Sequence, residues 1–75
     1  MKLSITHGNI DITGPAHVQE LEITSYMDED GEIRYPTITL IANGELEAGA
    51  IYVDGNLTDI EHITAMGILI DHPIV

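Results

Sequence analysis

The chain has 75 residues, no cysteine and a formal net charge of −11, with 13 carboxylates set against Lys2 and Arg34. A chain of this length forms a single domain, residues 1–75, and without cysteine it has neither a disulfide framework nor a thiolate metal site. The charge argues against direct binding to a nucleic acid or an anionic membrane, because both partners bind basic surfaces.

Apolar residues make up 44% of the chain and recur with a regular period, which favours a folded domain over a disordered one. No run approaches the roughly 18 apolar residues of a membrane span, and the first residues become polar at Thr6, too early for a secretory signal. We therefore expect an intracellular, cytoplasmic protein.

The first half of the chain reads as strands. Alternation of apolar residues over 2–13, broken at 6–9, predicts a hairpin. A second alternating run covers 18–27 and ends at Asp28-Glu29-Asp30-Gly31, whose Asp-Gly pair predicts a tight turn. The return strand, residues 32–42, is interrupted by Pro36, which indicates an edge position or a bulge.

The second half adds two strands and one helix. Asn43-Gly44 predicts a hairpin turn into a strand over 45–53. A capping box with Thr58 as N-cap and Glu61 three residues later predicts a short helix over 58–66, and residues 68–70 predict a buried final strand. The predicted fold class is α+β: a small antiparallel sheet of about five to six short strands in a meander, with one short helix near 58–66.

A six-residue spacing supports a different fold. Apolar residues separated by multiples of six, with small residues between several of them, are typical of a β-helix. Leu40, Leu46 and Tyr52 follow one another at this spacing, and Ile63 and Leu69 are again six residues apart. Thr58 interrupts this spacing, and a stack this short would need to polymerise to be stable.

The carboxylates supply the candidate partner-binding residues. Two residues along a strand span about 6.6–6.8 Å, close to the spacing of successive phosphates on a DNA strand. Rows of glutamate on two strands, beside an acidic turn, would present a ladder of negative charge to a basic groove. The residues of this ladder are Glu20, Glu22, Asp28, Glu29, Asp30, Glu32, Glu45 and Glu47. An ordinary solvated sheet face is the alternative interpretation.

The sequence contains no motif typical of a catalytic, metal-binding or cofactor-binding site. His7, His17, His62 and His72 are scattered, with no pair at the spacing of a metal site. The acidic run 28–32 is too short for a calcium-binding loop. No serine lies in a nucleophile motif and no glycine-rich phosphate loop is present. We therefore expect no enzyme activity, no metal and no cofactor.

In size, acidity and lack of catalytic motifs, the chain is similar in general character to the small inhibitor proteins that bacteriophages and mobile elements direct against host nucleases. The first functional hypothesis is accordingly a DNA mimic that docks on a basic surface of a nucleic-acid-binding protein. Such a protein would be encoded by a phage and would act against the defence system of the host cell. The second is an assembly module that forms a homo-oligomer through its aliphatic segments, in particular residues 68–70 and 73–75.

Overall fold

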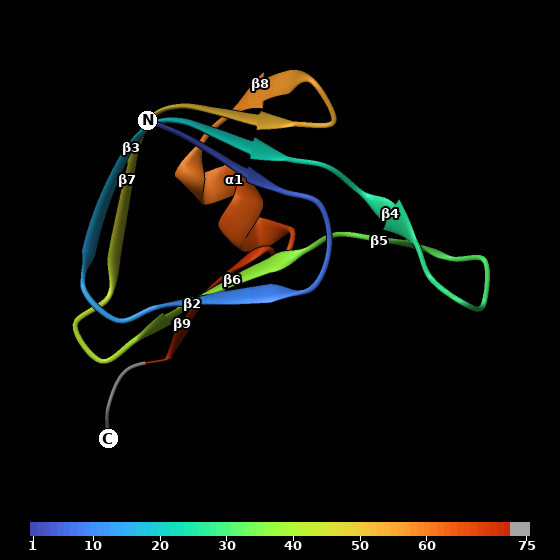
Figure 1. Cartoon of the computed structure of the whole chain (residues 1–75), viewed down its shortest axis with the longest axis horizontal. Coiled ribbons are helices and arrows are strands. Elements are labelled where there is room, and N and C mark those ends of the chain that lie inside the picture. The colour runs from blue at the N-terminus through green and yellow to red at the C-terminus, as the bar shows by residue number, and fades with distance from the viewer. Residues whose placement is uncertain (73–75) are drawn as a thin grey trace.

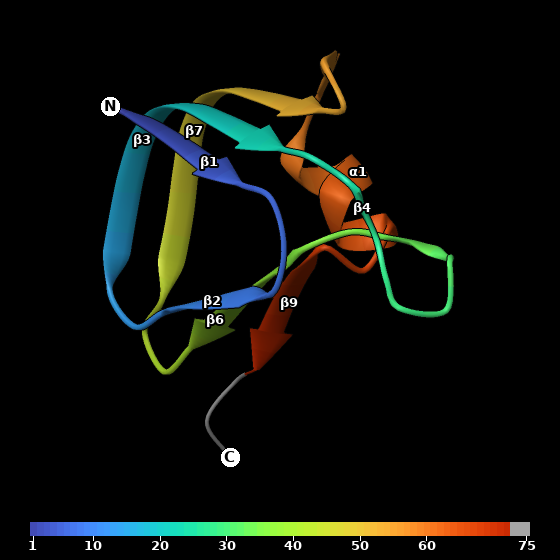
Figure 2. The same cartoon turned by 45° about the vertical axis from the view of Figure 1, so that its right-hand side comes forward.

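The computed structural model describes residues 1–72 and shows a short three-sided β-solenoid, in which the chain winds around one apolar core (Figure 1). Successive turns stack on one another, and residues 24–36 project from one corner, whereas the helix packs against the core through its buried Ile63 (Figure 1 and Figure 2). The elements in chain order are β1 (Lys2–Ile5), β2 (Asn9–Ile12), β3 (Pro15–Ile23), β4 (Tyr26–Met27), β5 (Ile33–Arg34), β6 (Thr37–Ile41), β7 (Glu45–Val53), β8 (Asn56–Thr58), α1 (Ile60–Ala65) and β9 (Leu69–His72).

The turns are joined by parallel strand pairing. β1, β3 and β7 pair in that order in one sheet, and β2, β6 and β9 pair in a second. The registers place equivalent residues above one another, so that apolar side chains form columns through the core. These columns are Leu3–Leu21–Ile51, Ile5–Ile23–Val53 and Ile10–Ile38–Leu69.

β3 and β7 each bend at a corner and so supply two of the three sides. The bend falls at Gln19 and Gly49, which are missing from an otherwise continuous register. A Cβ atom on Gly49 would lie 2.8 Å from the carbonyl oxygen of Gln19. The chains approach closely here, and only glycine fits without a shift of the backbone. Each turn therefore has a first side (residues 15–18 and 45–48), a second side (2–5, 20–23 and 50–53) and a third side (9–12, 37–41 and 69–72).

The two insertions leave the solenoid at the corner between its second and third sides. The first, residues 24–36, holds the antiparallel pair β4–β5, with Tyr26 opposite Arg34 and Met27 opposite Ile33. The second, residues 54–68, holds β8, which folds back antiparallel on residues 51–53 of β7, and helix α1. No helix within residues 1–72 is long and apolar enough to cross a membrane.

The predicted antiparallel meander is wrong, because the long-range strand pairs are parallel. β1 and β2 turn a corner and pair with β3 and β6, so residues 2–13 are not a hairpin. Alternation predicts strands but does not identify their partners. Asn43-Gly44 is also a corner, between β6 and β7, and the left-handed residue there is Ala42 (φ 59°). Parallel stacking is the arrangement that the six-residue spacing predicts, although Tyr52 points outward and Ile63 lies in the helix.

Several local predictions are confirmed. The strand over 45–53 has the predicted bounds, and the turn at residues 28–31 joins an antiparallel pair. The short helix is present as Ile60–Ala65, but its N-cap is Asp59 instead of Thr58: the Asp59 carboxylate accepts a hydrogen bond of 2.8 Å from the backbone N–H of His62. Pro36 lies between β5 and β6, where no strand hydrogen bond is lost.

Candidate interaction surfaces

The eight predicted partner-binding carboxylates lie in three separate places. Glu45 and Glu47 are on the first side of the solenoid, in register with Pro15 and His17. Glu20 and Glu22 come after the corner, on the second side, in register with Ala50 and Tyr52. The other four occupy the β4–β5 insertion: Asp28, Glu29, Asp30 and Glu32. The structure brings residues together within each group but places the groups on different parts of the molecule.

Basic groups lie beside several of these carboxylates. Lys2 Nζ is 2.8 Å from Glu22 Oε2, and this hydrogen bond raises the pKa of Lys2. His17 Nδ1 is 2.8 Å from Glu47 Oε2, which makes an ion pair when the imidazole is protonated. All of these side chains are largely exposed to solvent, so each pair contributes little to stability.

The acidic turn is organised by Asp28. Its Oδ1 atom accepts hydrogen bonds of 2.9 Å from the backbone N–H groups of Asp30 and Glu32, and its Oδ2 atom accepts one of 2.7 Å from Arg34 Nε. Arg34 also donates to Glu32 at 3.0 Å. The hydrogen bond from Arg34, followed by that from the Glu32 backbone, lowers the pKa of the Asp28 carboxyl below its ordinary value. The Asp28 oxygens therefore close the turn and are already bonded within it.

The two serines and the histidines and carboxylates outside these groups do not form a catalytic or metal site within residues 1–72. The Ser25 hydroxyl and backbone N–H donate to Asp54 Oδ1 at 3.1 and 2.8 Å, a contact that joins the two insertions. Ser4 is exposed on β1. Among residues 1–72, no group of three histidines and carboxylates is placed to hold a metal ion.

The first turn of the solenoid, residues 1–14, is its neutral end, and its only charged side chains are Lys2 and Asp11. The rest of the chain therefore carries the whole net charge of −11. Leu3 and Ile10 are half-buried here, whereas their column neighbours Leu21 and Ile38 in the middle turn are fully buried. Within the described residues, no strand covers the outer edge of β1 or β2.

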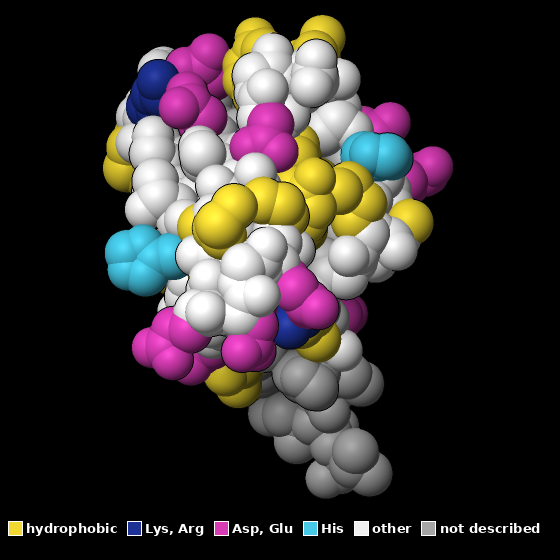
Figure 3. Space-filling model, turned by 90° about the vertical axis from the view of Figure 1, so that its right-hand side faces the viewer, with side chains coloured by type: hydrophobic (Ala, Val, Ile, Leu, Met, Phe, Trp, Pro, Cys, Tyr) yellow, Lys and Arg dark blue, Asp and Glu magenta, His cyan; other side chains and the backbone are white. Residues whose placement is uncertain are grey.

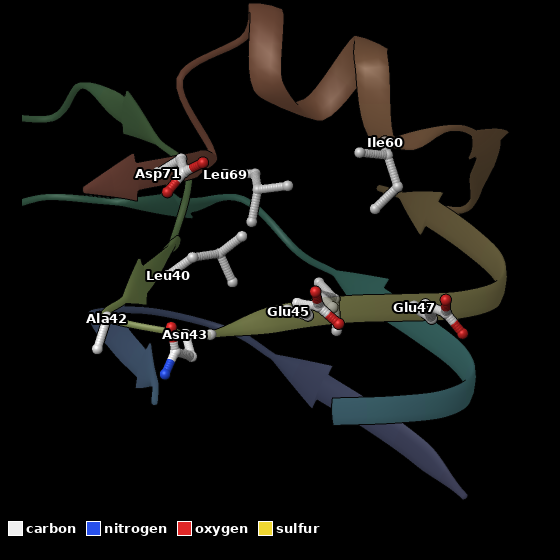
Figure 4. Close-up of a pocket in the computed structure, with 10 residues that line it drawn as sticks. Leu40, Ala42, Asn43, Glu45, Glu47, Ile60, Leu69 and Asp71 are labelled. Atoms are coloured by element: carbon white, nitrogen blue, oxygen red, sulfur yellow. The ribbon is translucent and has the colours of Figure 1, made fainter. Parts of the chain in front are cut away.

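The opposite end, which we call the acidic end, is hollow. A cavity of about 750 Å³ opens between the last turn and helix α1 (Figure 4). Its apolar lining comes from Leu40, Leu46, Ile60 and Leu69, and its charged lining from Glu45, Glu47 and Asp71. The sequence prediction missed this site, although the six-residue spacing of Leu40 and Leu46 was a signal for two of its apolar lining residues.

The face that carries the insertions exposes further apolar side chains. Met27 and Ile33, which are cross-strand partners in β4–β5, are 66% and 60% exposed, and Leu57 on β8 is 71% exposed. Figure 3 shows hydrophobic side chains gathered in the middle of this face with acidic residues around them. Such side chains are available for contact, but they bear no group that identifies a partner.

Comparison with known proteins returns no relative: no family model, no curated protein and no solved structure matches the chain. Function is therefore inferred from the geometry of the two ends of the solenoid and of the three acidic groups.

Proposed function

We propose that the protein is a non-enzymatic assembly module that forms a homodimer through its neutral end, with β1 as the pairing edge. The observation that carries this proposal is the coincidence of two features at one end of the solenoid. An unpaired parallel sheet edge and half-buried core residues lie at the end that has no net side-chain charge. Unpaired edges are the sites at which β proteins associate.

The backbone of β1 is oriented for pairing with a second copy. The carbonyl oxygens of Met1 and Ile5 accept from Gln19 and Thr24, so odd-numbered residues direct their backbone groups toward β3. Backbone groups alternate along a strand, so those of Lys2 and Ser4 point away from the sheet. A two-fold axis beside β1 would join these groups to β1 of the partner and bury Leu3 on both copies.

Charge favours this end over the other. Residues 42–72 contain six carboxylates and neither lysine nor arginine, so two acidic ends would repel each other. Head-to-tail stacking meets a different obstacle. An incoming β1 that continued the register would pair with residues 50–53 of β7, and β8 already pairs with residues 51–53. Neutral end against neutral end avoids both problems and gives a closed dimer instead of a filament.

Sedimentation measurements with an edge-blocking variant test the proposal. Ser4→Pro removes one outward N–H without removing a hydrogen bond to β3, and Ser4→Ala is the matched control. We expect a concentration-dependent dimer for the wild type and Ser4→Ala that added salt does not dissociate, because the interface itself is neutral. For Ser4→Pro we expect a monomer with unchanged far-ultraviolet circular dichroism. A wild type that stays monomeric, or a Ser4→Pro protein that still dimerises, would contradict the proposal.

Docking of the carboxylates on a basic, nucleic-acid-binding protein is the weaker candidate, because mimicry of a polyanion requires one continuous acidic face and the eight residues form three groups. The same measurement separates the two functions. Replacing Glu20, Glu22, Glu45 and Glu47 by lysine should leave the dimer intact and abolish capture of a basic partner.

We also propose that the protein acts in the cytoplasm, a reducing compartment that suits a chain without disulfides.

A further inference from the structure

The acidic end carries open strand edges as well as its cavity. Ile68 accepts a hydrogen bond of 2.7 Å from the N–H of Ile38, so the alternating backbone groups of Leu69 and Asp71 point away from β6. On the first side, Glu45 donates to Gly14 at 3.2 Å, and the backbone groups of Leu46 therefore point away from β3. β8 covers only residues 51–53, so within the described chain these edges remain free.

The side chains of β9 define what can pair with it. Leu69 extends the apolar column of Ile10 and Ile38. The neighbouring column runs Ile12, Leu40, Asp71, so an exposed carboxylate occupies a position that is apolar in the two turns before it. In Figure 4, Asp71 and Leu69 both border the cavity, with Leu40 beside them.

We propose that the acidic end binds an extended segment of a different protein, which adds a strand to β9 and carries an apolar residue and a lysine or arginine two residues apart. Residues two apart on a strand point to the same face. The apolar residue would continue the Leu69 column over the cavity, and the basic one would meet Asp71, while Glu45 and Glu47 add negative charge elsewhere in the lining. Main-chain hydrogen bonds supply affinity in this mode of recognition, and the alternate side chains supply specificity.

A second copy of this chain does not match that requirement. Its only lysine and arginine are Lys2 and Arg34. Ser4 lies two residues from Lys2, and Glu32 and Pro36 lie two residues from Arg34. Neither serine nor glutamate is apolar, and Pro36 has no N–H and is buried. The complementary charge must therefore come from another protein. This site is at the opposite end from the proposed dimer interface, and neither depends on the other.

Two blocked peptides of identical composition test the spacing. The in-phase probe, Thr-Val-Thr-Lys-Thr-Val-Thr, places valine and lysine on one face, whereas the out-of-phase probe, Thr-Val-Lys-Thr-Thr-Val-Thr, places the lysine on the other. Both peptides have the same net charge, so nonspecific attraction to the acidic protein contributes equally to the two affinities and does not affect their ratio. We expect the in-phase probe to bind the full chain about tenfold more tightly, as one charge-assisted hydrogen bond allows, with NMR shift changes centred on residues 69–71 and 46.

Two variants test whether Asp71 is the residue that causes the preference for the in-phase probe. Asp71→Asn should remove it, whereas Glu29→Gln combined with Asp30→Asn, on the distant hairpin, should leave it intact even though this variant loses more charge. Equal binding of the two probes by the wild type would overturn the proposal, as would a preference that persists in Asp71→Asn. Shift changes confined to β1 would indicate pairing at the neutral end and would also overturn it. Dimerisation measured on the same samples reports separately on the proposed function.

Discussion

The columns of the solenoid predict that one substitution has different costs in different turns. Ile10 and Ile38 belong to the same column, and Ile→Val removes the same methyl group at each position. Ile38 is fully buried between two neighbours, whereas Ile10 is half-buried at the neutral end. Ile→Val in a packed core costs about 0.5–1.5 kcal/mol. We expect a cost of about 1 kcal/mol for Ile38→Val and about half of that for Ile10→Val, because less of its surface leaves water on folding.

Urea unfolding followed by circular dichroism measures both costs at a protein concentration low enough to keep the chain monomeric. With an m-value of about 1 kcal/mol/M for a small domain, 1 kcal/mol corresponds to a shift of about 1 M in the urea midpoint, so the two variants are distinguishable. Equal costs for the two variants in the monomer would refute the column arrangement, since an antiparallel meander gives these positions no reason to differ in this way.

Three further predictions concern local structure. Gly49→Ala should destabilise the fold by at least about 2 kcal/mol in thermal unfolding, because the new Cβ would meet the Gln19 carbonyl, whereas Gly14→Ala, with open space at that position, should have little effect. Asp28 has a lowered pKa, so its stabilising contribution is complete above the ordinary aspartate value and is lost as the pH falls through the folded value; an NMR titration should show Asp28 titrating below the ordinary aspartate value, and Arg34→Gln should raise its midpoint. Asp59→Ala should cost about 1 kcal/mol through loss of the helix cap, and a cost indistinguishable from zero in urea unfolding would contradict that role.

The sequence predicts local structure well because each signal is contained in a few neighbouring residues. Asp-Gly at 30–31 is enough to identify its turn, and the alternation over 45–53 is enough to identify β7. Strand partners are harder to predict, because they depend on the number of residues that separate equivalent positions in successive turns. Lys2 pairs with Glu20, 18 residues later, but Glu20 pairs with Ala50 because residues 24–36 interrupt the repeat. The insertion hides the period that would have revealed the solenoid.

The candidate site was hidden for a related reason. The predicted acidic ladder assumed that Glu20 and Glu45 lie on one face of one flat sheet, whereas the bend at Gln19 and Gly49 puts them on different sides of the solenoid. The predicted final strand ends at residue 70, whereas β9 continues to His72 and its register puts Asp71 in a column with Leu40. The prediction that residues 73–75 pack between subunits lies outside the described residues.

The position of the two insertions has a practical consequence. Both leave the chain at the same corner, where the first turn instead uses only residues 6–8. The number of residues in the connection at this corner can therefore change without changing the strand registers on the second and third sides. The corner is suited to loop exchange: a short link in place of the β4–β5 hairpin, residues 26–34, or a foreign loop grafted there, keeps Tyr35 and the buried Pro36 in place. Such an exchange should leave the apolar columns intact and make this small protein a scaffold for presenting peptides.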